Sequence, residues 1–227
     1  MNIKEFFEQN PIIGLAFSGG VDSAYLLYAA CKYARRVKAY YVKSQFQPKF
    51  ELEDAVRLAD ELGAEMDIIE VDVLSDADVA SNPSNRCYYC KQRIFGNIIG
   101  RASEDGFKVV IDGTNASDDA GDRPGMKALR EMQVLSPLRL CGITKGEVRL
   151  RSREAGLFTW DKPAYACLAT RIPTGITITG ELLSRTETAE GFIGALGFSD
   201  FRVRLRGNSA LVQIRKNQHE LLIQNKN

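Results

Sequence analysis

The sequence predicts an α/β protein, in which a doubly wound parallel sheet is followed by a small α+β appendage. Short, continuous apolar runs alternate with segments of helical periodicity through most of the 227 residues, and this alternation is typical of βαβ units. Beyond Gly175 the pattern changes to one long amphipathic helix followed by two alternating strands. We therefore expect two domains, residues 1–175 and residues 176–227.

Four apolar runs predict the parallel strands, because strands buried on both faces lack polar alternation. They cover residues 12–17, 37–42, 66–71 and 109–111. Between these runs, apolar residues recur at helical spacing from Tyr25, from Leu52 and after Cys90. Residues 44–50 form a polar loop, and the loop over residues 75–85 is long enough to be functional.

The segment after the fourth strand is less regular. A short helix is expected near residues 126–132, and the capping box Thr144-Lys145-Gly146-Glu147 opens another helix that ends near Gly156. Residues 160–173 are irregular and interrupted by proline, so we expect a loop that carries part of a functional site.

The appendage begins with an amphipathic helix that stops at Gly197. Two strands follow, over residues 201–206 and 210–215, and Gly207-Asn208 is their predicted hairpin turn. A further helix is expected to begin before the last residue, Asn227.

Bulk composition excludes several classes of function. Thirty basic and 29 acidic residues leave a net charge of +1, which gives no support to binding of nucleic acid or of a membrane. No apolar run reaches transmembrane length, and residues 1–10 lack a signal-peptide core. Five cysteines without a secretory signal favour the reducing cytoplasm. The single histidine, His219, argues against a Cys-His nucleophile pair.

A candidate anion site lies where the first predicted strand turns into a helix. The six residues at this turn are Ser18, Gly19, Gly20, Val21, Asp22 and Ser23. The glycines allow close approach of the backbone to a ligand, and the first amides of the helix point outward without partners. A Walker-type loop would need a lysine within this hexamer, and the hexamer contains none.

A second polar stretch follows the fourth predicted strand. It begins with Asp112, Gly113 and Thr114. Because ligands of doubly wound sheets bind beyond the carboxyl ends of the strands, we expect this stretch and the hexamer to face one nucleotide. Asp22 and Asp112 are candidate ligands for the Mg²⁺ that neutralises its phosphates.

The hexamer SGGVDS resembles the PP-loop of the ATP pyrophosphatase superfamily, in which ATP is cleaved to AMP and pyrophosphate. Together with later motifs, it is similar to the LarE-type ATP-dependent sulfur transferases. These motifs occur in the order DGTNASD, RPG, SPL, TKGEVR, WDKPAYACLATRIPTG and FRVR, and the resemblance runs from about residue 10 to residue 206, the end of the first strand of the appendage. Of these, KPAxACLATR is specific to that family.

The resemblance implies an enzyme that modifies a small nucleotide, the precursor of the nickel-pincer nucleotide. One carboxylate of pyridinium dicarboxylate mononucleotide is adenylated by ATP, and sulfur then replaces AMP to give a thiocarboxylate. The residues implied in ATP binding are those of the hexamer and Asp112, Gly113 and Thr114, with Asp22 and Ser23 also catalytic. The family also implies a homo-oligomer, a trimer or hexamer.

The resemblance assigns further residues to sulfur and acceptor. Cys167 matches the sulfur-bearing cysteine, and Arg202 and Arg204 match a pair that receives the substrate phosphate. For the arginines, the alternative is a solvated edge strand. Glu190 matches an acidic residue that binds metal or substrate, and its alternative role is an exposed helix glutamate. Tyr88 matches an aromatic residue beside the substrate, and its alternative role is core packing.

Cysteine spacing predicts a subtype within this family. Cys87 and Cys90 form a CxxC on the loop before a helix, and Cys167 is a third candidate ligand. Members with this trio are similar to enzymes in which three cysteines hold a 4Fe-4S cluster whose fourth iron carries sulfide. Zinc is the competing metal, with Cys141 as fourth ligand. We expect Cys31, on the apolar helix face, and Cys141 to be structural.

Other functions stay open at this point. A PP-loop tRNA thiolase would use the same three-cysteine cluster, but the neutral charge and the lack of a basic patch argue against it. A second alternative is a synthetase that uses ammonia, but such an enzyme would have no function for the three cysteines. A third alternative is a regulatory protein that binds ATP without catalysing a reaction. The appendage is also shorter than in the family, whose members usually continue with a further strand, and Gln213-Ile214-Arg215 stands where many members have an acidic residue.

Overall fold

A computed structural model of the chain describes residues 1–118 and 124–225. The chain forms two compact units. The first comprises Met1–Ser44, Lys49–Val71 and Asn85–Lys162, and the second comprises Gln45–Pro48, Asp72–Ser84 and Pro163–Asn227. The sequence predicts a domain boundary after residue 175. Compact units do not show which segments fold independently, so this boundary stays a prediction.

A four-stranded parallel sheet organises the first unit. Its strands lie in the order β3-β2-β1-β4, and every pairing is parallel. Their bounds are Ile12–Ala16 for β1, Arg36–Lys43 for β2, Glu65–Glu70 for β3 and Val110–Ile111 for β4. These are the four apolar runs that the sequence predicts as strands, so the predicted parallel sheet is confirmed.

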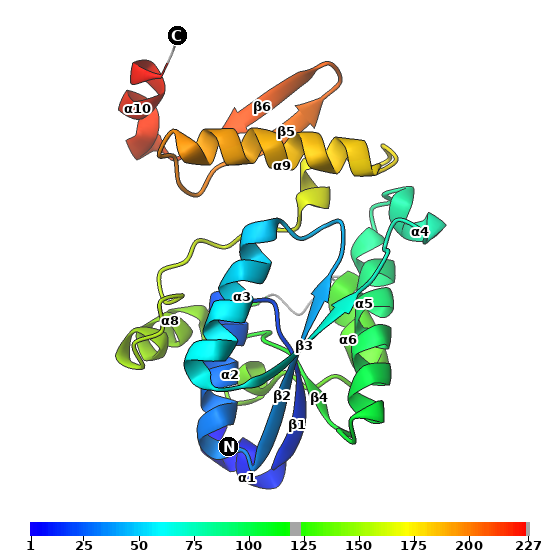
Figure 1. Ribbon diagram of the computed structural model, residues 1–227, viewed down its shortest axis with the longest axis vertical. Coiled ribbons are helices and arrows are strands. Elements are labelled where there is room, and N and C mark those ends of the chain that lie inside the picture. Colours follow the sequence, from blue (N-terminus) through cyan, green and yellow to red (C-terminus); the bar gives the residue numbers. More distant parts are fainter. Residues whose placement is uncertain (119–123, 226–227) are drawn as a thin grey trace. The chain divides into compact units, whose positions relative to one another are not determined.

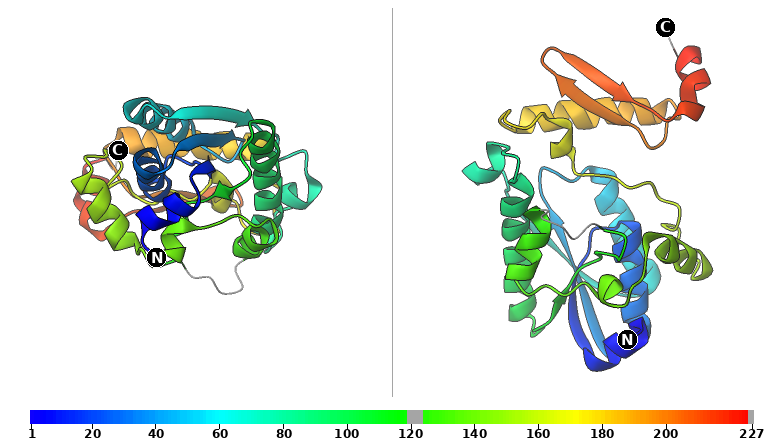
Figure 2. Two further views of the ribbon diagram at one scale, coloured as in Figure 1. Left: turned by 90° about the horizontal axis from the view of Figure 1, so that it is seen from below. Right: turned by 180° about the vertical axis from the view of Figure 1, so that it is seen from behind.

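Helices cover both faces of this sheet. Figures 1 and 2 show α2 and α3 on one face and α5 and α6 on the other. The core between them is apolar and includes Phe7, Leu15 and Leu26, which are fully buried. The bounds are Ile3–Gln9 for α1, Val21–Tyr33 for α2, Lys49–Leu62 for α3, Arg86–Glu104 for α5, Pro124–Glu131 for α6, Pro137–Leu140 for α7 and Lys145–Glu154 for α8. The doubly wound α/β fold is thereby confirmed.

The strand order creates a switch point beside β1. The chain moves from β1 outward to β2 and β3, and then returns to place β4 on the other side of β1. The loops that follow β1 and β4 therefore leave the same edge of the sheet in neighbouring positions. Open α/β sheets bind their ligands at such a point.

The second unit holds the appendage and the segments packed with it. Its long helix α9 (Gly180–Ala195) lies along a hairpin of β5 (Arg202–Arg206) and β6 (Ser209–Gln213), as Figure 1 shows. The predicted hairpin and the helix that stops at Gly197 are both confirmed, the latter with φ of 90° at Gly197. Short elements complete the unit: α4 (Ala77–Ala80), the 3₁₀ helices η1 (Leu168–Arg171) and η2 (Lys216–Gln218), and α10 (His219–Gln224).

Two predicted loops contain helical turns. The loop over residues 75–85 includes α4, because the Asp76 carboxylate accepts hydrogen bonds from the amides of Asp78 and Val79 and so caps one turn. The loop over residues 160–173 includes η1, whose N-cap residue is Cys167. Turns this short leave no periodic apolar pattern from which they could be predicted.

The position of the CxxC pair also differs from the prediction. Helix α5 begins at Arg86, so Cys87 and Cys90 lie in its first turn and a half and not on the loop before it. None of the helices within the described ranges combines the length and apolar character needed to cross a membrane.

Candidate active site

The hexamer after β1 folds into a loop closed by its own hydroxyl groups. The Ser23 hydroxyl donates to the Gly20 carbonyl at 3.1 Å and accepts from the Ser18 amide at 3.3 Å. It also lies 3.1 Å from the Ser18 hydroxyl. Gly20 is the N-cap of α2 and has no side chain to satisfy the first amides of that helix. The loop therefore presents unpaired amides, as an anion site requires.

Two glycines allow other segments to pack closely against this loop. Gly19 has φ of 70°, and a Cβ atom there would lie 3.1 Å from the Glu51 carbonyl oxygen of α3. A Cβ atom on Gly113 would lie 2.9 Å from the backbone nitrogen of Ser23. The hexamer and the loop after β4 are thus in direct backbone contact, as their places at one sheet edge predict.

Asp112 shapes the loop after β4. Its carboxylate is 6% exposed and accepts hydrogen bonds from the hydroxyl groups of Thr114 at 2.5 Å and Ser136 at 2.6 Å. Both oxygens are therefore engaged within the protein. These contacts suit a residue that positions Gly113 and Thr114 better than one that binds a metal directly.

Asp22 occupies a different environment at the mouth of the two loops. Its Oδ2 atom lies 2.5 Å from Lys145 Nζ, and its Oδ1 atom accepts a hydrogen bond from Asn115 Nδ2 at 3.2 Å. Lys145 is the first residue of α8, whose predicted capping box between Thr144 and Glu147 is present. Asp22 is about one-fifth exposed, so this carboxylate remains accessible to a ligand.

A second lysine reaches the hexamer from the end of the first unit. Lys162 Nζ lies 2.7 Å from Asp54 Oδ2 and donates to the Gly19 carbonyl at 3.3 Å. Lys145 and Lys162 thus bring positive charge to a loop that has no lysine of its own. Two cations beside a set of unpaired amides favour a polyanion such as a triphosphate.

Cys87 opens onto a cavity beside the nucleotide loops. This cavity of about 350 Å³ is lined by Cys87 and Lys91 of α5, by Thr114, and by Asp118, Pro124, Gly125 and Met126. Arg86 Nη2 lies 4.0 Å from Cys87 Sγ. A potential sulfur ligand therefore shares a cavity with the predicted ATP-binding residue Thr114.

Tyr88 lines a neighbouring cavity of about 360 Å³. Its hydroxyl group donates to Glu131 Oε2 at 2.6 Å, which raises the pKa of Tyr88. Tyr88 is half-buried and belongs to a cavity wall, and its contact with substrate stays a prediction.

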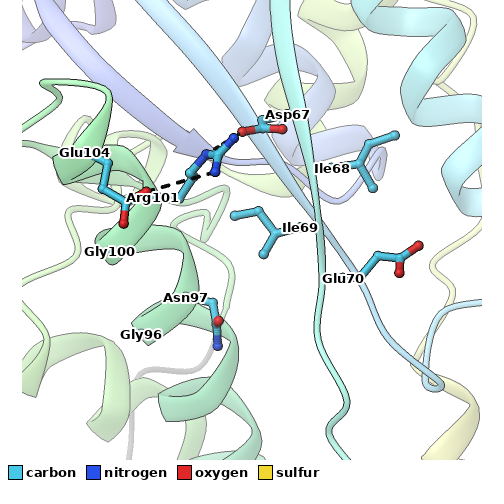
Figure 3. Close-up of a pocket in the computed structure, with 9 residues that line it drawn as sticks. All are labelled: Asp67, Ile68, Ile69, Glu70, Gly96, Asn97, Gly100, Arg101 and Glu104. Atoms are coloured by element: carbon cyan, nitrogen blue, oxygen red, sulfur yellow. Dashed lines mark hydrogen bonds and ion pairs between the residues drawn. The ribbon is translucent and has the colours of Figure 1, made fainter.

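A cavity of about 500 Å³ lies away from these loops, between the edge strand β3 and helix α5. Figure 3 shows Ile69 pointing toward α5 and Ile68 pointing away from it. Arg101 is paired with Asp67 at 2.8 Å, and Glu70 and Glu104 line the same cavity. Three carboxylates against one paired guanidinium disfavour a phosphate, so this cavity is not the nucleotide site.

In the second unit, Glu190 holds together the segments that carry Cys167 and the arginine pair. Glu190 Oε1 accepts from Arg171 Nε at 2.7 Å and from the Val203 amide at 2.9 Å. Glu190 Oε2 accepts from the Tyr165 hydroxyl at 2.5 Å and from Arg171 Nη2 at 3.2 Å. Arg171 and Glu190 are 1% and 6% exposed, so this ion pair is buried.

Burial alone would raise the pKa of the Glu190 carboxyl group. The hydrogen bonds from Arg171, Tyr165 and Val203 outweigh burial and hold its pKa below the usual range. The exposed-glutamate alternative is therefore wrong. Its contact with metal or substrate stays a prediction, because all four hydrogen bonds described for its carboxylate are made within the protein.

Arg202 and Arg204 lie on β5 on either side of buried Val203, as the predicted alternation requires. Arg202 donates to the Ala164 carbonyl and Arg204 to the Thr170 carbonyl, the latter at 2.9 Å. These carbonyls lie three residues before and three residues after Cys167. The two guanidinium groups therefore support both ends of the loop that carries this cysteine.

The predicted site residues thus fall into two groups. The hexamer, Asp112, Gly113, Thr114, Tyr88, Cys87 and Cys90 belong to the first unit, whereas Cys167, Glu190, Arg202 and Arg204 belong to the second. No group of three His, Cys, Asp or Glu side chains within the described ranges is close enough to hold a metal ion. Arg123 of the RPG motif lies outside those ranges. Cys31 is exposed and not on the buried face of α2 as expected, and Cys141 packs partly buried against the core.

Three further residues of this site escaped prediction. Lys145, Lys162 and Asn115 stand inside motifs that the sequence singles out, TKGEVR, WDKPA and DGTNASD. The motifs supply a signal that these segments matter, but not which side chain reaches the hexamer. The corresponding contacts span 123, 143 and 93 positions.

Comparison with known proteins fits this geometry. Residues 13–88 match the family model described as queuosine biosynthesis protein QueC. The chain has the fold of NMN synthetase from Francisella tularensis, with a TM-score of 0.56 at 17% identity over 71% of this chain and 72% of that one. It is 35% identical to an uncharacterized protein of Synechocystis sp. over 98% of this chain and 84% of that protein.

A named relative carries the comparison further. Over 89% of this chain and 74% of the relative, the sequence is 32% identical to pyridinium-3,5-bisthiocarboxylic acid mononucleotide synthase of Lactiplantibacillus plantarum. That identity extends across both compact units, and the fold and the paired nucleotide loops agree with it. The chain therefore belongs to the LarE-type family of sulfur transferases, within the PP-loop ATP pyrophosphatase superfamily.

Proposed function

We propose that this chain is an ATP-dependent sulfur transferase acting on pyridinium dicarboxylate mononucleotide. One acceptor carboxylate is adenylated, and sulfur then replaces AMP to give a thiocarboxylate. The observation that supports adenylation is the contact between the hexamer and the loop after β4. Asp22, Lys145 and Lys162 lie beside this contact. The acceptor is inferred from the printed name of the relative.

The nucleotide loops suit AMP transfer. The acceptor carboxylate oxygen attacks the α-phosphorus of ATP, the bond between that phosphorus and the bridging oxygen breaks, and pyrophosphate leaves. The unpaired amides at the start of α2 receive the departing pyrophosphate. Lys145 and Lys162 stabilise the charge that accumulates on it. Asp22 is the proposed Mg²⁺ ligand, because it is the accessible carboxylate beside these amides.

The acceptor's phosphate is assigned to Arg202 and Arg204. Each guanidinium group has five N–H donors, so each can hold a loop carbonyl and still donate to a phosphate. The hydrogen bonds to the Ala164 and Thr170 carbonyls link this phosphate site to the Cys167 loop. Phosphate binding and the position of Cys167 are coupled by these contacts.

A 4Fe-4S cluster is the proposed sulfur source, held by Cys87, Cys90 and Cys167. The donor set fits this group, since thiolates are its ligands and three of them leave one iron open. Cys87 and Cys90 lie three residues apart at the start of one helix, and Cys87 opens onto a cavity of about 350 Å³. Bound by these cysteines, the cluster would supply the sulfur that replaces AMP on the acceptor.

The experiment uses anaerobic protein with ATP, Mg²⁺ and pyridinium-3,5-dicarboxylate mononucleotide. We expect AMP and pyrophosphate without ADP, and a product in which one oxygen has been exchanged for sulfur. Accumulation of ADP and orthophosphate would contradict the PP-loop chemistry. Pyrophosphate release with a thiolated tRNA product would identify a tRNA thiolase, and no turnover with either acceptor would leave a regulatory ATP-binding protein.

The proposal also includes a homo-oligomer in the cytoplasm, a trimer or a hexamer, as the family implies. Light scattering on the purified protein measures its mass directly. A monomer over the working concentration range would contradict this part of the proposal without touching the chemistry.

A further inference from the structure

Arg149 joins helix α8 to the segment that ends in Lys162. Its guanidinium group donates from Nη1 to the Trp160 carbonyl and from Nη2 to the Lys162 carbonyl, each at 2.8 Å. Both donors belong to one rigid plane, so the two carbonyls are held in a fixed relation to each other. The backbone of Lys162, the last residue of the first unit, is therefore tied to α8.

The side chain of Lys162 extends from this tied backbone to the hexamer. Its Nζ atom lies 2.7 Å from Asp54 Oδ2 of α3 and donates to the Gly19 carbonyl at 3.3 Å. A carbonyl oxygen beside a phosphate repels it unless a cation neutralises the oxygen. At 3.3 Å the bond is already longer than most N–H···O bonds, so a backbone shift of a few tenths of an ångström would break it.

The segment before Lys162 is anchored firmly at its start and weakly at its end. Leu157 and Thr159 are buried, with exposures of 5% and 0%, whereas Trp160 is 38% exposed. Two backbone bonds cross the segment, from the Trp160 amide to the Leu157 carbonyl at 3.2 Å and from the Lys162 amide to the Thr159 carbonyl at 3.1 Å. Both lie at the long end of the usual range. The end of the segment therefore depends on the two bonds from Arg149.

Helix α8 thereby arranges both of the cations beside the hexamer. Lys145, its first residue, reaches Asp22 directly. Arg149 lies four residues later and so shares a helix face with Lys145. One helix face supplies the first cation itself and fixes the second, Lys162, through two backbone carbonyls.

We infer that Arg149 is a positioning residue for Lys162 in the binding of the ATP phosphates. This inference rests on the proposed function, in which Lys162 stabilises the charge on the pyrophosphate group. Arg149 acts by holding the backbone from which the ammonium group extends, and it does not touch the nucleotide. A residue that acts in this way affects nucleotide binding only while Lys162 is present.

The test is a double-mutant cycle with α,β-methylene-ATP and Mg²⁺, in which calorimetry measures the dissociation constant of the analogue. The methylene bridge blocks AMP transfer, so binding is measured without turnover. Lys162→Ala should weaken binding about 10-fold or more, as loss of a bond to a charged group does. Arg149→Ala should weaken it about 10-fold in the wild-type background and less than about twofold when residue 162 is already alanine.

Arg153→Ala is the matched control. Arg153 lies four residues after Arg149 on the same helix, and its guanidinium group contacts Trp160 through the ring, 5.3 Å from the centroid. Its variant should therefore keep the wild-type affinity. Arg149→Lys should fall between the wild-type protein and Arg149→Ala, because an ammonium group lacks the planar fork that holds both carbonyls.

A second cycle separates Lys162 from the other cation. Arg149→Ala should keep its effect of about 10-fold in a Lys145→Ala background, since Lys145 reaches Asp22 without help from Arg149. Disappearance of the effect in that background would mean that Arg149 acts through the start of α8, and it would overturn the inference.

Each remaining result also has one meaning. An effect of Arg149→Ala that is equal with and without Lys162 would overturn the inference, as would unchanged affinity in either single variant. A wild-type protein that does not bind the analogue would refute the inference and the proposed function together. The expected cycle without pyrophosphate release from ATP and the dicarboxylate acceptor would refute the proposed function alone. If circular dichroism shows that Arg149→Ala is unfolded, Arg149→Gln takes its place in both cycles.

Discussion

Lys145 lies 2.5 Å from Asp22, although 123 positions separate the two residues in the chain. The pair is at the mouth of the nucleotide loops, and Asn115 holds the other oxygen of the same carboxylate. In a Walker-type loop the lysine is part of the loop itself. Here the fold supplies the cation from the first turn of α8. If the Asp22 carboxylate binds Mg²⁺ as proposed, Lys145 becomes available to a phosphate.

Lys145→Ala should therefore impair the nucleotide step. We expect kcat/KM for ATP in pyrophosphate release to fall about 10- to 100-fold, the range for loss of a bond to a charged group. Stability should change little, because Lys145 is one-third exposed. Arg153→Ala, in the last turn of the same helix, is the control and should leave kcat/KM unchanged. Unaltered kcat/KM in Lys145→Ala would make the pair a structural contact only.

Local sequence was sufficient to predict the strands and the nucleotide loops. The short apolar run of residues 12–17, bounded by glycines, favours a buried strand, and those glycines favour a tight turn into the helix that follows. The contacts of Lys145 and Lys162 are different, because which side chain reaches the hexamer depends on how segments more than 100 positions apart pack. No periodicity or spacing encodes that choice.

Glu190 shows a second limit. Apolar residues in its helix predict a buried stripe, yet the buried positions of α9 are Leu183, Thr186 and Glu190. A glutamate enters such a stripe only when partners compensate its charge. Those partners, Arg171, Tyr165 and the Val203 amide, come from two other segments, the loop that carries Cys167 and strand β5. Its burial could not have been predicted before these segments were placed.

Gly113→Ala tests the contact between the two nucleotide loops. The added Cβ atom would lie 2.9 Å from the backbone nitrogen of Ser23, so the loops must separate and the first amides of α2 must move. We expect the affinity for a non-hydrolysable ATP analogue, measured by calorimetry, to fall at least about 10-fold, as with one lost charged hydrogen bond. Gly146→Ala in α8 is the control, because nothing lies within 4 Å of its added atom. A Gly113→Ala variant with wild-type affinity would show that the loops tolerate separation.

Glu190→Gln should destabilise the protein in a pH-dependent way. Removing one partner of a buried ion pair typically lowers the free energy of unfolding by about 3–5 kcal/mol. Because the glutamine amide has the same shape as the carboxylate, we expect a loss of about 3 kcal/mol at pH 7. The pKa of Glu190 in the folded protein lies below its unfolded value of about 4.3. Its contribution to the free energy of unfolding is therefore fully present above that value and is lost as pH falls through the folded-state pKa.

Urea unfolding at neutral and acid pH measures this difference. The difference in free energy of unfolding between the wild-type protein and Glu190→Gln should decrease steadily below about pH 4. Glu181→Gln, in the exposed first turn of the same helix, should show a small effect at either pH. A gap that is constant with pH would mean that the glutamate charge does not stabilise this unit.

Arg202→Ala and Arg204→Ala should raise KM for the acceptor and leave ATP binding intact. Loss of one group from a desolvated charge pair costs roughly 2–5 kcal/mol, so KM should rise about 30-fold or more. Lysine at either position should rescue only in part, because a point charge cannot make the bidentate contact. Both alanine variants should also speed alkylation of Cys167, since they release the Ala164 or Thr170 carbonyl.

Arg206→Ala is the control for these variants. It lies on the same strand and the same face, at the end next to the hairpin turn, and makes no hydrogen bond to the Cys167 loop among the described contacts. We expect wild-type KM and wild-type alkylation of Cys167. If Arg202→Ala and Arg204→Ala behave like Arg206→Ala, the pair is a solvated face of a hairpin.

The cysteines give the sharpest prediction. Anaerobic protein should be brown, with about four iron and about four sulfide per chain, as the cluster type requires. Alanine at Cys87, Cys90 or Cys167 should abolish sulfur transfer and leave pyrophosphate release measurable, because none of these cysteines belongs to the nucleotide loops. Cys31→Ala is the matched control: this cysteine is exposed on α2, and its loss should alter neither metal content nor transfer.

Metal analysis separates the cluster from its two rivals. A structural zinc normally closes a tetrahedron of four protein ligands, so it would also require Cys141. A colourless protein with one zinc per chain that is lost in Cys141→Ala would establish that site and refute the cluster. Full sulfur transfer by Cys87→Ala would also refute the cluster. Cys167 would then be the sulfur donor and would lose its own sulfur atom in the reaction. In that case transfer should stop after one turnover per chain, whereas a cluster resupplied with sulfide supports many.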